Sequence, residues 1–293
     1  MPGGASWLIA GRQRGADPSR HDGMRAMSGT ATGRVSSADG TTIVFDRSGA
    51  GPAIILVHGA FTGRAHPILS DVAAALAPWF TVFNYDRRGR GDSGDTQPYA
   101  VEREIEDLAA LVEEAGGSAM VFGGSSGSGL ALETAARNPA ISKLAVWEPP
   151  YHVDESAPTL PHDFAAQLDA LVKEGRRADA VELFMVQAAE APVEAVAAMR
   201  LLPSWPDSEA AAHTLAYEAA VMGPGNALPA QRLAAITQPT LVLTGGNSPA
   251  WMTNAGKAVA ETIDGAVYRV LRGQTHNVSP EALAPELLEF FTA

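Results

Sequence analysis

The segment around Ser125 constrains the fold of this chain more than any other part of its sequence. Residues 119–122 form a short apolar run that enters a helical pattern directly through Gly123-Gly124-Ser125-Ser126-Gly127. In so sharp a strand-to-helix turn, a Cβ atom at either flanking glycine position would collide with neighbouring backbone, while the central serine is held exposed and strained. A glycine/serine linker would not be bounded so tightly by an apolar strand and a helix. We therefore predict that Ser125 is a nucleophile at a helix N-terminus, whose positive end favours developing negative charge.

Apolar runs alternate with helical patterns along most of the chain. Two strands at residues 34–38 and 41–46, joined by the turn Asp39-Gly40, form a predicted antiparallel hairpin. Strands buried on both faces are then indicated by nearly continuous apolar runs at residues 53–58, 80–85, 119–122, 143–147 and 240–244. Between them, apolar residues recur at helical spacing, most clearly at Val101, Ile105, Leu108 and Val112. The alternation predicts an α/β fold with a mostly parallel central sheet flanked by helices.

The alternation stops at residue 149 and resumes near residue 238. The intervening segment is rich in Ala and Glu and carries helical periods interrupted by prolines, which predicts a helical cap at residues 149–237. Strands at residues 239–246 and 267–271 and a helix at residues 280–290 follow it. The α/β core is therefore expected to comprise residues 34–148 and 238–293. Residues 1–33, rich in Gly, Arg and Ser, are expected to form a disordered N-terminal tail.

Composition excludes several classes of function. The chain carries 33 acidic and 21 basic residues, for a formal net charge of −12, which disfavours binding to nucleic acid and to anionic membrane surfaces. It has no cysteine, so disulfides, thiolate metal sites and a cysteine nucleophile are excluded. No apolar run approaches the length of a membrane span, and no metal-binding motif is present. We expect a soluble, cytoplasmic protein that contains no metal or cofactor. A homodimer is a possible assembly.

Two further motifs give the chain a resemblance to a known superfamily. His58-Gly59-Ala60 follows the first buried strand, and Asp86-Arg87-Arg88-Gly89-Arg90-Gly91-Asp92-Ser93-Gly94 follows the next one. Together with the Ser125 turn, they resemble the α/β-hydrolase superfamily over about residues 34–293. The resemblance implies the α/β-hydrolase fold and an oxyanion hole formed by the backbone N–H groups of Ala60 and Ser126.

The superfamily's chain order of serine, acid and histidine selects the general base. Of the seven histidines, His276 alone lies in a short loop between the last predicted strand and the last predicted helix. We therefore assign it as the base that activates Ser125. His58 is expected to brace its loop and to be a poor candidate for the base.

The acid departs from the superfamily's common pattern. That pattern places an aspartate after the strand that follows the cap, but here the strand ends in Gly245-Gly246-Asn247-Ser248. Glu148 instead ends an apolar run, and a carboxylate at a buried strand tip needs a hydrogen-bonded partner such as His276. Pro149 is expected to hold Glu148 in an extended conformation. The alternatives are that Glu148 only caps its strand, or that it pairs with an arginine of the loop 87–90.

A strand-tip Glu-Pro together with Gly-x-Ser-Ser-Gly is similar to the subgroup of zearalenone-type lactone hydrolases. This resemblance implies a cofactor-independent serine hydrolase that cleaves a carboxylic ester or lactone through an acyl-enzyme intermediate. The expected substrate is small, neutral and apolar, because the cap supplies many apolar side chains and no dense basic cluster. Phe61, His152 and Trp251 are candidate substrate-binding residues. A C–C bond hydrolase or acyltransferase using the same residues, and a non-catalytic small-molecule-binding protein, are the alternatives.

Overall fold

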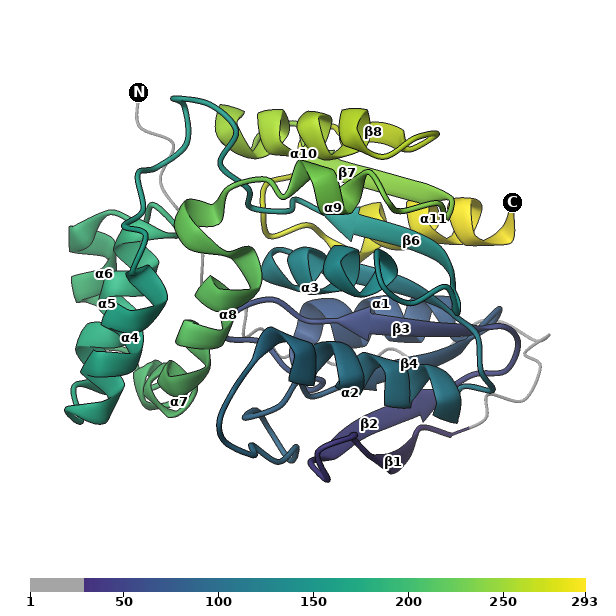
Figure 1. Cartoon of the computed structure of the whole chain (residues 1–293), viewed down its shortest axis with the longest axis horizontal. Coiled ribbons are helices and arrows are strands. Elements are labelled where there is room, and N and C mark those ends of the chain that lie inside the picture. Colours follow the sequence, from purple (N-terminus) through teal and green to yellow (C-terminus); the bar gives the residue numbers. More distant parts are fainter. Residues whose placement is uncertain (1–28) are drawn as a thin grey trace, which may run out of the picture.

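The computed structural model describes residues 29–293, in which eight strands form a single twisted sheet. The strand order is β1-β2-β4-β3-β5-β6-β7-β8, and β2 pairs antiparallel with both β1 and β4. All the remaining neighbours are parallel. The strands span Ala31–Ser36 (β1), Thr42–Ser48 (β2), Ala53–Val57 (β3), Thr81–Tyr85 (β4), Ala119–Gly124 (β5), Ile141–Trp147 (β6), Thr240–Gly245 (β7) and Val267–Leu271 (β8). The predicted α/β fold is confirmed (Figure 1).

The first strand begins earlier than the sequence pattern predicted. Residues 1–28, most of the predicted tail, lie outside the described residues, but Ala31 to Gly33 belong to β1 and pair with β2. The small residues of this segment show no alternating apolar pattern, so its strand is defined only by its pairing with β2. A Cβ atom at Gly33 would lie 2.4 Å from the ring of Phe45, so glycine allows that ring to pack across β1.

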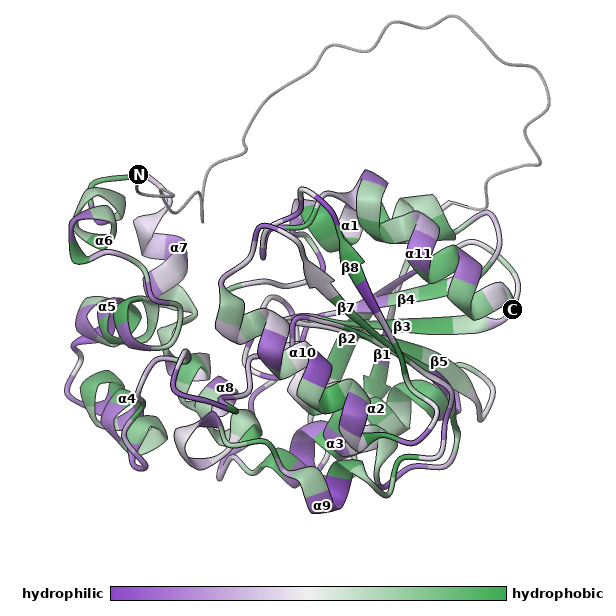
Figure 2. Cartoon of the chain, turned by 90° about the horizontal axis from the view of Figure 1, so that it is seen from above, coloured by the Kyte–Doolittle hydropathy of each residue, from purple (hydrophilic) through white to green (hydrophobic). Residues whose placement is uncertain are grey.

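Helices cover both faces of the sheet (Figure 2). On one face, α1 (Pro67–Leu76) and α11 (Pro280–Thr292) pack against apolar side chains of β3, β4 and β7. On the other face, α2 (Val101–Glu114), α3 (Ser126–Ala135) and α10 (Ala250–Thr262) bury a second apolar cluster. Strands covered on both faces account for the continuous apolar runs of β3, β5 and β6.

A group of short helices lies between β6 and β7 in the sequence, and most of them stand to one side of the sheet (Figure 1). They are α4 (Phe164–Lys173), α5 (Arg177–Gln187), α6 (Val193–Met199), α7 (Trp205–Ala210), α8 (Leu215–Met222) and α9 (Ala230–Leu233). Helices α4 to α8 share a third apolar cluster, and α8 also packs against α3 of the core. The division at residues 148 and 238 into core and cap stays a prediction. Within residues 29–293, no helix combines the length and apolar character required to cross a bilayer.

Candidate active site

Ser125 occupies the turn between β5 and α3 in a conformation that serine rarely adopts. Its φ is 55° and its ψ is −131°, so the backbone is strained at this residue. A Cβ atom at Gly123 would lie 2.5 Å from the carbonyl oxygen of Gly127, and one at Gly127 would lie 2.5 Å from the carbonyl oxygen of Val57. Both glycines are therefore required by close backbone approach, and together they present the Ser125 hydroxyl at the start of α3.

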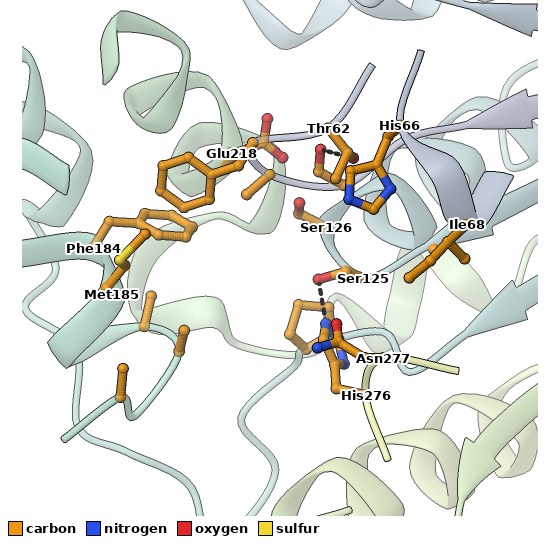
Figure 3. A pocket seen from close by; sticks show the side chains of 18 of the residues that line it. Thr62, His66, Ile68, Ser125, Ser126, Phe184, Met185, Glu218, His276 and Asn277 are labelled. Atoms are coloured by element: carbon orange, nitrogen blue, oxygen red, sulfur yellow. Dashed lines mark hydrogen bonds between the residues drawn. The ribbon is translucent and has the colours of Figure 1, made fainter. Parts of the chain in front are cut away.

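Three side chains that are distant in the sequence form a continuous hydrogen-bonded chain. The Nε2 atom of His276 lies 3.0 Å from Oγ of Ser125, and its Nδ1 atom lies 2.8 Å from Oε2 of Glu148. The second oxygen of Glu148 accepts a hydrogen bond of 2.7 Å from the backbone N–H of Gly245. Figure 3 shows the Ser125 hydroxyl directed toward the His276 ring. This is the arrangement of a nucleophile, a base and an orienting carboxylate.

Glu148 is completely buried at the carboxyl end of β6. It is not extended as Pro149 suggested, because its φ is 45°. The backbone bends here while the Glu148 N–H still donates to the carbonyl of Leu243, and this tertiary contact overrides the local preference of a residue before proline. The predicted alternative partners are engaged elsewhere, since Arg87 pairs with Glu104 and Glu218, and Arg88 pairs with Asp107 and Asp39.

The loop that carries His276 is held in place by contacts from two neighbouring strands. The indole N–H of Trp147, the last residue of β6, donates to the His276 carbonyl at 3.0 Å. The backbone N–H of Asn247, just beyond β7, donates to the carbonyl of Gln274 at 2.8 Å. The carbonyl of Gln274 would also lie 2.5 Å from a Cβ atom at Gly245. The glycine at the end of β7 therefore allows the His276 loop to approach closely enough for the imidazole to reach Glu148.

The two predicted oxyanion donors flank Ser125. Ser126 is the first residue of α3, where backbone N–H groups have no acceptor within their own helix. Ala60 lies in the loop after β3 and lines the same pocket as Ser125. A Cβ atom at the preceding Gly59 would lie 2.9 Å from Cβ of Ser125, so glycine there lets this loop approach the serine.

His58 braces this loop, as predicted. Its ring is fully buried, and its Nε2 atom lies 2.6 Å from Oδ1 of Asn84. Burial lowers the pKa of His58 to about 3, so the ring is neutral at physiological pH. The hydrogen bond to Ser125 comes from the ring of His276 and not from that of His58.

Ser125 opens into a cavity of about 470 Å³ between the core and the helices α4 to α8. Phe61 lines this cavity and packs edge-on against Phe184, while Met185, Met199, Trp205 and Met222 add further apolar surface. Figure 3 shows Phe184 and Met185 on one side of Ser125 and Ile68 on the other. Leu201, in the same helical segment, is 87% exposed and is not one of the lining residues.

The other two candidate substrate-binding residues differ in position. Trp251 lines the cavity, and its indole N–H donates to the Glu190 carboxylate. His152 is not one of the lining residues, and its ring packs edge-on against Trp251 with 5.5 Å between the ring centres. The prediction that His152 contacts substrate is thus not supported by its position.

Several polar lining residues were missed from the sequence. Thr62 and His66 follow the His58-Gly59-Ala60 motif, Glu218 lies on α8, and Asn277 follows His276. Thr62, His66 and Asn277 could have been proposed from the sequence, because each closely follows a motif that was assigned to the site. Partial burial lowers the pKa of His66, which favours its neutral ring. No group of three His, Asp or Glu side chains within residues 29–293 is arranged to hold a metal ion.

Comparisons with known proteins show the family to which the chain belongs. Residues 54–286 match the alpha/beta hydrolase family. The crystal structure of an alpha/beta hydrolase from Sphaerobacter thermophilus is 55% identical, with a TM-score of 0.82 over 88% of this chain and 100% of that one. An uncharacterized hydrolase of Bacillus subtilis, YraK, is 38% identical over 34% of this chain and 38% of its own length.

More distant solved structures show the same fold. The enol-lactonase from Burkholderia xenovorans is 22% identical, with a TM-score of 0.64 over 88% of this chain and all of that one. The 2-hydroxy-6-oxo-6-phenylhexa-2,4-dienoate hydrolase of a Rhodococcus strain is 20% identical, with a TM-score of 0.61 over 90% of this chain and all of that one. The family match over most of the chain and the 55% identical structure support hydrolase activity, and this chain belongs to the alpha/beta hydrolase family.

Proposed function

We propose that this protein is a serine hydrolase that cleaves a carboxylic ester or lactone through an acyl-enzyme intermediate. The observation that carries the proposal is the continuous hydrogen-bonded chain from Ser125 through His276 to the buried carboxylate of Glu148. A buried carboxylate that contacts Nδ1 leaves Nε2 free to accept the serine proton. This arrangement is what activation of a serine hydroxyl requires.

In the proposed reaction, His276 removes the proton from Ser125 as its oxygen attacks the carbonyl carbon of the substrate. The Ala60 and Ser126 N–H groups stabilise the oxyanion of the tetrahedral intermediate. The protonated imidazole, stabilised by Glu148, then gives its proton to the departing alkoxide. Water attacks the acyl-enzyme with His276 again as the base, and the acid is released. In a lactone, the alcohol and the acid remain parts of one product.

The lining of the cavity supports a neutral, apolar substrate. Its described lining residues include no lysine or arginine, and most are apolar. Of its two carboxylates, Glu218 is paired with Arg87 and Arg90, while Asp207 is exposed. A substrate carboxylate would thus be removed from water without a cationic partner, at a cost of several kcal/mol.

The same feature weighs against one alternative. The C–C bond hydrolase among the structural neighbours acts on a dienoate, which carries a carboxylate. Acyl transfer on the same three residues differs only in whether an alcohol replaces water in the second step. A non-catalytic small-molecule receptor is disfavoured, because a receptor has no need for a strained serine with a hydrogen-bonded base. A cytoplasmic location, a homodimer and the absence of a cofactor stay predictions.

The proposal is tested by labelling the purified full-length chain with a fluorophosphonate and by assaying it against neutral esters and lactones. We expect rapid, stoichiometric labelling of Ser125 and release of the carboxylic acid from at least one substrate of the panel. The Ser125→Ala variant is expected to show neither. A wild-type chain that is not labelled, and that turns over nothing in the panel, would support the receptor alternative.

A further inference from the structure

The loop that carries Ala60 is strained and is held from outside. Phe61 has a φ of 60°, a conformation that a bulky aromatic residue adopts only where surrounding contacts impose it. Those contacts reach the carbonyl oxygens of the loop. Arg87 Nη1 donates to the carbonyl of His58 at 3.1 Å, and Arg90 Nη1 donates to the carbonyl of Thr62 at 3.1 Å and also to that of Gly59.

The contacts on the Gly59 carbonyl determine the direction of a proposed oxyanion donor. This oxygen accepts from Arg90 Nη1 and, at 3.0 Å, from Oγ1 of Thr62. The carbonyl of Gly59 and the N–H of Ala60 belong to one planar peptide unit, and in a trans peptide the two bonds point in opposite directions. Fixing the oxygen therefore fixes the Ala60 N–H on the other side. A cationic donor on the oxygen also polarises the peptide and strengthens its N–H as a donor.

Arg90 is itself fixed by a carboxylate from the cap. Its Nη2 donates to Oε1 of Glu218 on α8, and Arg87 donates to Oε2 of the same side chain at 2.8 Å. The side chains of Arg87, Arg90 and Glu218 are 1%, 5% and 1% exposed, so no solvent screens them. Without the Glu218 carboxylate, the positive charges of Arg87 and Arg90 would repel each other. Arg90 would also lose the partner that holds its guanidinium group against the loop.

We propose that Thr62, Arg90 and Glu218, here called the carbonyl clamp, are positioning residues that set the direction of the Ala60 N–H. The inference rests on the proposed function, since it assigns a task to the oxyanion hole of that reaction. The clamp acts through the Gly59–Ala60 peptide. The hydrogen bond that it directs, from the Ala60 N–H to the substrate oxygen, strengthens as negative charge develops on that oxygen. Through Glu218, helix α8 supports transition-state stabilisation in addition to covering the cavity.

The test uses the full-length chain with p-nitrophenyl butyrate as substrate and phenylboronic acid as a mimic of the tetrahedral adduct. The variants are Thr62→Val, which removes one donor at nearly constant shape, Arg90→Lys and Glu218→Gln. Each is expected to lower kcat about 10-fold or more, short of the roughly 10²–10³-fold cost of losing an oxyanion donor. The inhibition constant of phenylboronic acid should rise by a similar factor. That of N-(4-nitrophenyl)butanamide, a ground-state analogue, should stay within about twofold.

Tyr99→Phe is the matched control, because Tyr99 donates to Glu104 at 2.9 Å in the same charged cluster but contacts no carbonyl of the loop. It should retain the wild-type kcat and boronate affinity. Unchanged kcat in Thr62→Val, or equal weakening of boronate and amide, would overturn the clamp even if Arg90→Lys fails to fold. Ser125→Ala separates the two proposals. An active Ser125→Ala variant contradicts the serine mechanism itself, whereas an inactive one together with clamp variants that keep the wild-type kcat contradicts only the clamp.

Discussion

Oε2 of Glu148 lies 2.8 Å from Nδ1 of His276, although the strands that precede these residues, β6 and β8, are separated in the sheet by β7. The intervening strand contributes a donor instead of an acid, because the N–H of Gly245 at its end binds the other Glu148 oxygen at 2.7 Å. No carboxylate follows β7, and the backbone N–H at the end of this strand instead binds the carboxylate that follows β6. This relationship makes the proposed role of Glu148 directly testable.

Glu148→Gln is expected to lower kcat/KM for p-nitrophenyl butyrate by about 10²–10⁴-fold. The glutamine retains the shape of the side chain but removes the charge that stabilises the protonated imidazole. Steady-state kinetics of the folded variant provide the measurement. Asn247→Ala and Ser248→Ala, at the position where the common superfamily pattern has its acid, should cost much less. Nearly normal turnover by Glu148→Gln would show that a different acid, or none, supports His276.

Ser125→Ala and Ser126→Ala form a pair of adjacent variants with opposite expected results. Loss of the Ser125 hydroxyl removes the nucleophile and should reduce kcat by about 10³-fold or more. The Ser126 hydroxyl is buried without a hydrogen-bond partner among residues 29–293, and its proposed role uses only the backbone N–H. Ser126→Ala should therefore retain kcat within about threefold, since that N–H remains in place. The reverse pattern would show that the nucleophile had been misassigned by one residue.

The sequence was sufficient to propose the three residues of the hydrogen-bonded chain, because each has a local signal. Ser125 was recognisable because two glycines, an apolar strand and a helix all lie within a few residues of it. His276 followed from its place after the last strand. Glu148 could be proposed because a carboxylate that ends a buried apolar run needs a partner.

Features that depend on contacts between distant segments were not predictable. The φ of 45° at Glu148 arises from its pairing with β7 and from the turn toward His276, against the local preference set by Pro149. His152 was placed at the site from its proximity in sequence to Glu148, but it does not line the cavity and instead packs edge-on against Trp251. The contact of Arg90 with Glu218 joins residues 128 positions apart, and no periodicity in either segment indicates it.

His58 makes folding stability depend on pH in a defined direction. Its folded-state pKa of about 3 lies below the ordinary value of 6.5, chiefly because burial disfavours the charged ring. Below about pH 6.5 the unfolded chain gains a proton that the folded chain does not, so this contribution lowers stability as pH falls toward 3, and it has no effect at higher pH. Between pH 7 and pH 5, His58 should thus cost roughly 2 kcal/mol of unfolding free energy.

Urea unfolding of wild type and His58→Gln at pH 5 and pH 7 measures this contribution. The change in unfolding free energy between the two pH values is compared between the two proteins. The glutamine amide retains a donor for Asn84 but does not titrate, so the variant should lose less stability on acidification than wild type. His162→Gln replaces an exposed histidine and serves as the matched control. An identical pH dependence in His58→Gln and wild type would mean that other groups account for acid destabilisation.

The absence of lysine and arginine from the described lining of the cavity predicts discrimination by substrate charge. The mono-p-nitrophenyl ester of succinic acid should have a kcat/KM about 100-fold or more below that of p-nitrophenyl butyrate, because its carboxylate would lose water without gaining a cation. Met199→Arg places a cation at a partly buried lining position on α6 and should narrow this ratio, chiefly by raising activity on the succinate ester. Met199→Gln, neutral and similar in volume, should leave the ratio near the wild-type value. If wild type hydrolyses both esters equally well, the acyl chain does not enter the apolar cavity beside helices α4 to α8, and the proposed preference for neutral substrates is wrong.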